Sequence, residues 1–206
     1  MNAAGPTAER VYEVLKGHVL HGAFKPGTRL DPAALAERVD SSVTPVRASL
    51  NILVGEGLVE TGTGEGFRVP LIDEPGLRDR YGWNAELVRL ALRRASLRPQ
   101  GPLQPLAMGD PPRRAAALFL HLARSSQNLE HAAAIARLND RLHAARLAEV
   151  EVLPHVESEL DDLAGAVEDG GVPRLRQLLA DYHRRRVRAA SAILRRLYRT
   201  DDAELR

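Results

Sequence analysis

The sequence predicts a mainly helical protein made of two domains. Three short amphipathic segments and a glycine-rich hairpin fill residues 1–72, whereas apolar side chains recur at helical spacing through most of residues 73–206. Pro70 and Pro75 bracket a short linker between these parts. A chain of 206 residues is long enough to form two small cores. We therefore expect one domain over residues 1–72 and an all-helical domain over residues 73–206.

The N-terminal part combines three helices with short strands. Capping residues, turns and polar breaks predict three helices, from Thr7 to about residue 21, over 32–39, and from Ser42 or Thr44 to about Glu56. They also predict short strands over 28–30, 58–60 and 67–69. The loop 61–66 is glycine-rich, but a strand follows it, whereas phosphate-binding loops precede a helix. The order is typical of a winged helix-turn-helix.

The third helix carries the residues that we expect at DNA. In a helix-turn-helix this helix enters the major groove by its N-terminal end. Ser42 and Thr44 stand where hydroxyls and free backbone N–H groups meet phosphate. Arg47 lies one turn later, opposite the apolar stripe of the helix, and arginine to guanine is the commonest specific contact. The alternative is a capping residue beside a solvated arginine.

The N-terminal part resembles the DNA-binding domain of the GntR family over residues 7–70. The segments that carry the resemblance are His18–Leu30, Leu35–Val39, Thr44–Arg47, Leu50, Leu53 and Glu56–Val59. It implies a repressor-like homodimer on a pseudo-palindromic operator of double-stranded DNA. The residues assigned to the DNA interface are Arg38, Ser42, Val43, Thr44, Pro45, Arg47 and, in the wing, Gly66.

Several residues depart from the family pattern. Val43 stands where a basic residue is usual, Asp40 where glycine is usual, and Glu65 where a basic or polar residue is common in the wing. Residues 1–75 also hold 7 basic and 10 acidic side chains, a net charge of −3. With fewer phosphate partners we expect lower affinity and a shallower salt dependence. A regulator that has lost DNA affinity and serves as a protein-interaction module is therefore an alternative.

The C-terminal part is predicted to be a helical bundle. Helices are expected at about 76–98, 112–126, 128–149, 152–169 and 172–199. Residues 74–199 resemble the helical ligand-binding domain, the FCD domain, of the FadR subgroup, on Phe119–His121, Asn128, Ala166 and Leu178–His183. The resemblance implies dimerisation and a small, anionic effector, with His121, Asn128 and His183 as candidate pocket residues.

The metal shell of that subgroup is incomplete in this sequence. Many such domains bind a divalent metal with one Asp and three His. His121 and His183 match two of these ligands, but Ala117 and Leu160 occupy the other two positions. We expect no bound metal or other cofactor, with the two histidines as remnants that line a pocket or a core. A zinc, nickel or manganese ion at a shifted set of ligands is the alternative.

Composition excludes several functions. The sequence has no cysteine, and therefore no disulfide, thiolate zinc site or cysteine nucleophile. It shows no membrane-length apolar run or signal peptide, so we expect a cytoplasmic protein without a membrane partner. Nucleophile-elbow, phosphate-loop and zinc-protease motifs are missing, and we expect no enzymatic activity. A metal-dependent enzyme built on the histidines of the bundle remains the catalytic alternative.

Overall fold

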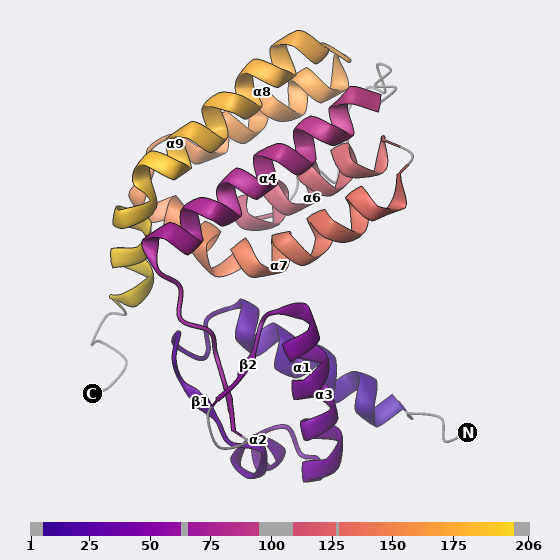
Figure 1. Ribbon diagram of the computed structural model, residues 1–206, viewed down its shortest axis with the longest axis vertical. Helices are drawn as coiled ribbons and strands as arrows, with labels where there is room; N and C mark the ends of the chain where they lie inside the picture. The colour runs from indigo at the N-terminus through magenta and orange to yellow at the C-terminus, as the bar shows by residue number, and fades with distance from the viewer. Residues whose placement is uncertain (1–5, 63–65, 95–108, 127, 200–206) are drawn as a thin grey trace. The chain divides into compact units, whose positions relative to one another are not determined.

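The computed structural model describes residues 6–62, 66–94, 109–126 and 128–199. It divides into two compact units, Met1–Ile72 and Asp73–Arg206, called here the N-terminal unit and the helical unit. The predicted fold class is confirmed: the described residues are mainly helical, with one small sheet in the N-terminal unit (Figure 1).

The N-terminal unit is a three-helix cluster with a small antiparallel sheet (Figure 1). Its elements are α1 (Pro6–Leu20), β1 (Arg29–Leu30), α2 (Pro32–Arg38), α3 (Val43–Glu56), β2 (Glu60–Thr61) and β3 (Phe67–Arg68). The strand order is β1-β3-β2, and Phe67 of the central strand is paired with Leu30 on one side and Thr61 on the other. Strands β2 and β3 flank the wing loop.

The apolar stripes of the three helices and the sheet form one core. Its buried residues are Val11, Leu15, Val19, Leu30, Leu35, Ala36, Val39, Val46, Leu50, Leu53, Leu58, Val59, Phe67 and Val69. The Asp31 carboxylate caps α2 by accepting a hydrogen bond from the Ala33 N–H at 2.7 Å. Gly57 ends α3 in the left-handed conformation, with φ 72°. Local capping and burial together fix the position of α3.

The helical unit packs five described helices around a second core (Figure 1). They are α4 (Glu74–Arg94), α6 (Pro111–Arg124), α7 (Leu129–Val152), α8 (Val156–Glu168) and α9 (Val172–Tyr198). Helix α4 packs against α6, α7 and α9, and α9 also packs against α7 and α8. None of the described helices is long and apolar enough to cross a membrane.

The break between α7 and α8 lies later than the sequence predicts. Helix α7 continues to Val152, whereas the expected helix ended near residue 149. Pro154 stops further helical hydrogen bonding because it has no N–H, and His155 turns the chain with φ 58°. Glu149 lies in the last turns of α7 and is buried, and it takes part in a network of buried charges.

Candidate functional site

The turn between α2 and α3 is held by α1. Asp40 adopts a left-handed conformation with φ 48°, at the position where the sequence comparison expected glycine. The Arg10 guanidinium donates from Nη2 to the backbone carbonyls of Val39 at 3.1 Å and Asp40 at 3.2 Å. These bonds satisfy two carbonyls of the turn. They therefore fix the direction in which α3 leaves it.

The start of α3 presents unused backbone donors. Ser42 is the N-cap, with extended φ −86° and ψ 162°, but its side chain makes no capping hydrogen bond. The N–H groups of Val43 and Thr44 have no helical acceptor at this end, and Pro45 has no N–H. Ser42, Val43 and Thr44 are all exposed. An uncapped, exposed helix start of this kind suits a phosphate oxygen.

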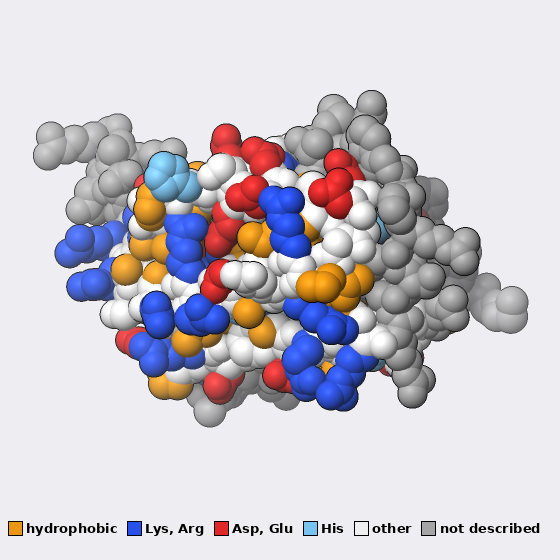
Figure 2. All heavy atoms as spheres, turned by 90° about the horizontal axis from the view of Figure 1, so that it is seen from above, with side chains coloured by type: hydrophobic (Ala, Val, Ile, Leu, Met, Phe, Trp, Pro, Cys, Tyr) orange, Lys and Arg blue, Asp and Glu red, His pale blue; other side chains and the backbone are white. Residues whose placement is uncertain are grey.

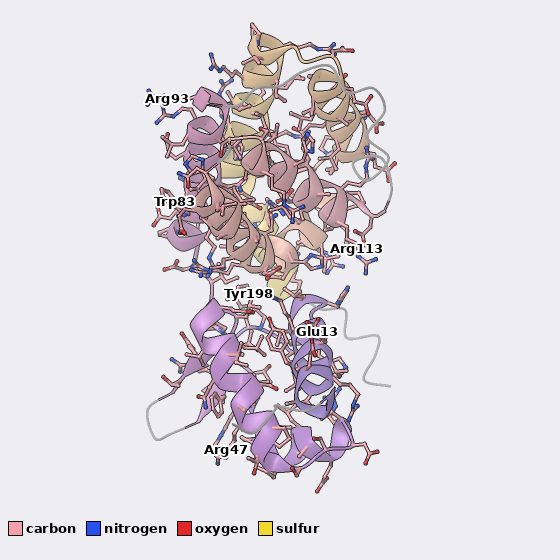
Figure 3. The ribbon with its side chains drawn as sticks, turned by 90° about the vertical axis from the view of Figure 1, so that its right-hand side faces the viewer. Glu13, Arg47, Trp83, Arg93, Arg113 and Tyr198 are labelled. Carbon is pink, nitrogen blue, oxygen red and sulfur yellow. The ribbon has the colours of Figure 1, made fainter. Side chains whose placement is uncertain are left out.

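One face of α3 continues outward from that start. Arg47 is exposed near the N-terminal end of α3 (Figure 3), and no described residue holds it in an ion pair or hydrogen bond. Ala48 and Asn51 are exposed on the same side. Sequence reasoning did not single out these two residues. Helical spacing would have found them, since Asn51 lies four residues after Arg47, Ala48 lies four residues after Thr44, and residues three and four apart share a face.

The remaining predicted DNA residues lie around α3. Arg38 ends α2 and places its guanidinium over the Phe24 ring, 5.4 Å from the centroid. Gly66 precedes β3, and its carbonyl accepts from the Gly62 N–H at 2.7 Å. Glu65 lies outside the described residues. The structure therefore brings Ser42, Val43, Thr44, Pro45 and Arg47 together on α3, and places Arg38 and Gly66 on neighbouring elements.

His183, the last of the predicted pocket residues, is buried in the helical unit. Its Nδ1 lies 2.6 Å from the Leu179 carbonyl oxygen and its Nε2 lies 2.8 Å from the Asn84 side-chain oxygen. Burial lowers the pKa of His183 to about 4, so the ring is neutral near pH 7. Both neighbours are oxygen atoms, and a neutral imidazole has one N–H, so the ring donates to only one of them in this orientation of the Asn84 amide. The Asn84 Nδ2 has no partner among the described residues, and turning the amide by 180° would bring it to Nε2 as a donor while Nδ1–H donates to Leu179.

The structure does not place the other two predicted pocket residues beside His183 in any described cavity. His121 is half-buried on α6, and burial and Arg124 lower the pKa of its imidazole. Asn128 is exposed and caps α7, with its side-chain oxygen accepting from the Glu130 N–H at 3.0 Å. A cavity of about 230 Å³ between α4 and α9 contains His183 but neither of these residues in its wall.

Buried charges fill the interior of the helical unit. The Glu149 carboxylate accepts from the Tyr81 hydroxyl at 2.6 Å and from Arg186 Nε at 2.7 Å. Arg186 also donates to Glu159 at 2.8 Å. Its side chain is 1% exposed and that of Glu149 is 2% exposed. Burial first, and the Glu149 carboxylate second, raise the pKa of Tyr81 well above its usual value.

The outer surface of the helical unit carries charges of both signs. Figure 2 shows Lys and Arg side chains gathered at the left and lower edges of one face, and Asp and Glu side chains mostly toward its upper edge. Exposed pairs such as Arg184–Asp181, with 2.8 Å between the charged atoms, contribute little to stability. The buried charges are therefore more relevant to this unit than its exposed ion pairs.

Residues 7–69 match the family model of bacterial regulatory proteins, gntR family. The match spans every element of the N-terminal unit, from α1 to β3. Residues 7–69 are therefore similar to the DNA-binding domain of that family, and this matched region is called the GntR domain below.

Characterised relatives resemble the chain in and around its GntR domain. The HTH-type transcriptional regulator McbR of Escherichia coli is 36% identical over 88 residues, which are 42% of this chain and 40% of McbR. The Nta operon transcriptional regulator of Aminobacter aminovorans is 38% identical over 77 residues, 35% of this chain and 37% of that protein. The chain thus spans about two fifths of the length of the relatives that it matches.

Two solved structures resemble the whole fold. E. coli McbR/YncC has a TM-score of 0.64 at 23% identity, over 93% of this chain and 99% of that one. A Rhodococcus sp. RHA1 protein described as a GntR transcriptional regulator has a TM-score of 0.74 at 17% identity, over 92% and 98% of the two chains. At these identities the likeness shows a shared fold, a winged helix-turn-helix followed by a helical domain.

The donor atoms of the helical unit do not fit the divalent metal of the FadR subgroup. Ala117 and Leu160 supply no ligand atom, and Leu160 is 2% exposed in the core. The Nε2 atom of His183 faces the Asn84 side-chain oxygen at 2.8 Å rather than an open site. In the described part of the chain, no three His, Cys, Asp or Glu side chains form a group that could hold a metal ion. A metal-free helical unit stays a prediction.

Proposed function

We propose that this chain is a transcription regulator that binds operator DNA through its GntR domain. The observation that carries the proposal is the start of α3. There, an N-cap without a side-chain bond leaves backbone donors open, and Thr44 and Arg47 are exposed beside it. Phosphate oxygens meet the helix start, and Arg47 reaches a base edge in the major groove. The family match of residues 7–69 supports the same role.

The regulator acts as a homodimer on a pseudo-palindromic site. A helix-turn-helix dimer places its two recognition helices about one turn of DNA apart, so that protein and operator share a two-fold axis. We assign the helical unit to the FadR subgroup and give it the dimerising role. Repression is the mode we propose, in the cytoplasm, where chromosomal DNA is accessible. No enzymatic activity is part of this function.

A small anionic metabolite controls operator binding through the helical unit. One location that supports this idea is the cavity of about 230 Å³ between α4 and α9. Arg89, Arg176 and His183 line this cavity, together with Glu86, whose carboxylate lies 2.5 Å from the Arg89 guanidinium. Because the imidazole of His183 is neutral near pH 7, the positive charge for an anion comes from arginine.

The test is a binding titration with DNA that flanks the chain's own gene. At about 50 mM salt we expect nanomolar to sub-micromolar binding to one site, with one dimer per site, and much weaker binding to scrambled DNA of equal length. Equal binding to both DNAs, or none to either, contradicts the proposal. Absence of binding favours the alternative in which the GntR domain is a protein-interaction module.

A further inference from the structure

A row of exposed arginines follows the outward face of α9. It consists of Arg184, Arg188, Arg195 and Arg199, called here the arginine row. Their spacing of four, seven and four residues keeps them on one side of the helix, over a length of about 22 Å. The opposite side of α9 holds its buried residues and packs against α4, α7 and α8. The row therefore faces solvent along its whole length.

Three of the four guanidiniums in the row lack an anionic partner. Arg184 pairs with Asp181 at 2.8 Å. No described residue holds the side chain of Arg188, Arg195 or Arg199 in an ion pair or hydrogen bond. The sequence from residue 182 to residue 199 contains no Asp or Glu. The helix therefore does not neutralise this strip of positive charge itself.

The acidic side chains of the neighbouring helices pair with other arginines of α9. Glu159 of α8 lies 3.4 Å from Arg185 and 2.8 Å from Arg186. Glu151 of α7 lies 2.5 Å from Arg196. These ion pairs balance the sides of α9 that turn toward α7 and α8. They leave the charge of the outward row uncompensated.

The helix dipole accounts for only part of the row. Cations are stabilised near a helix C-terminus, and this effect falls off within the last turn. Arg195 and Arg199 lie there, whereas Arg188 lies more than two turns before the end of α9 at Tyr198. The charge at Arg188 therefore has no explanation in the stability of the helix.

An open hollow of about 460 Å³ lies beside the first part of the row. Its lining residues are Asp181, Arg184, Arg185, Arg188 and Ala189. Because Arg184 and Arg185 each have a carboxylate partner, Arg188 supplies the charge that an anion can use. The planar guanidinium matches the oxygens of a phosphate group, so the hollow suits a phosphate.

The distribution of charge along the row and along the chain favours duplex DNA as the polyanion. A line of separated cations matches the repeated charges of a phosphate backbone better than it matches one small anion. Residues 76–206 hold 22 basic and 17 acidic side chains, a net charge of +5, whereas residues 1–75 carry −3. The helical unit thus holds the cations that an acidic GntR domain lacks.

We propose that the arginine row of α9 is a second DNA-binding surface, which contacts the phosphate backbone of double-stranded DNA without reading its sequence. The inference goes beyond the proposed role of the GntR domain and rests on it only for the choice of DNA as the polyanion. Helix α3 selects the operator, and the row adds affinity that is equal for every sequence.

The test is a salt series of binding by the full chain to operator DNA and to scrambled DNA of equal length. The row variant combines Arg188→Gln, Arg195→Gln and Arg199→Gln. It should bind both DNAs at least about tenfold more weakly at low salt, and its slope of log K against log salt should fall by at least about 2, because each phosphate contact contributes about 0.9. The ratio of operator to scrambled affinity should stay at the wild-type value.

Two further variants separate the position of the charge from its amount. The matched control combines Arg124→Gln, Arg137→Gln and Arg141→Gln, which remove the same charge from exposed positions of α6 and α7. It should keep the wild-type slope. A variant with lysine at the three row positions keeps the charge and should bind both DNAs nearly as the wild type does. Gln and Lys have helix propensities close to that of Arg, so the fold is preserved.

The outcomes distinguish the row from the operator site. Unchanged affinity and slope in the row variant overturn the proposal, and so do equal losses in the row variant and the matched control. Tighter binding of single-stranded RNA than of duplex DNA, lost in the row variant, makes RNA the partner and also overturns it. A row variant that weakens binding to a wild type without operator preference supports the row and contradicts only the operator role of the GntR domain.

Discussion

The burial of His183 makes the stability of the helical unit depend on pH. Its pKa is about 4 in the folded chain, because burial and the nearby Arg186 and Arg146 disfavour the charged ring, whereas an unfolded histidine titrates near 6.5. Between these values the unfolded chain binds more protons than the folded one, so stability rises with pH through this window. The contribution is complete above about pH 6.5 and is lost as pH falls toward 4.

The difference of about 2.5 pH units corresponds to about 3.4 kcal/mol, of which about 2 kcal/mol is lost between pH 7.5 and pH 5. Urea unfolding at several pH values measures it, with the fluorescence of Trp83, the single tryptophan of the sequence, as the reporter on α4 (Figure 3). His183→Gln should flatten the pH dependence above pH 5. A variant with the same slope as the wild type would refute the assignment of a neutral, buried imidazole.

Three further substitutions test the rest of the structure. Asp40→Gly should stabilise the GntR domain by up to about 1 kcal/mol, since it removes a side chain from a left-handed position; a lower melting temperature would contradict this. Glu149→Gln should cost about 3–5 kcal/mol in urea unfolding because it strips the buried Arg186 of a charged partner, while the exposed Glu86→Gln should leave the unfolding curve nearly unchanged. Asn51→Ala should relax base preference at one operator position by about 1–3 kcal/mol in a binding panel of single-base variants, and unchanged preference at every position would exclude a base contact.

Local signals in the sequence were sufficient to predict the N-terminal unit. The Asp31 cap, the Gly57 stop and the stripe Val46, Leu50 and Leu53 act over a few residues, and each has the predicted role in the structure. The uncapped state of Ser42 was not foreseen. It depends on the side-chain rotamer at the turn, which sequence spacing does not determine.

The interior of the helical unit was much less predictable. Glu149, Arg146 and Arg186 come from two helices, and on sequence spacing alone each reads as a solvated charge. Their burial follows from how α7 and α9 pack, a long-range property that periodicity does not carry. The resemblance to the helical ligand-binding domain predicted His121 and Asn128 as pocket residues. In the structure, Asn128 serves as the N-cap of α7.

The affinity of Arg47→Ala for the operator and for scrambled DNA, measured over a series of salt concentrations, tests the central claim most directly. Arg137→Ala, which changes an exposed arginine of α7 that lines no described cavity, is the control. The account predicts a loss of about 1–3 kcal/mol at the operator for Arg47→Ala, a much smaller loss on scrambled DNA, and wild-type binding by the control. Wild-type operator affinity in Arg47→Ala would contradict the assignment of the α3 N-terminal face as the surface that reads DNA.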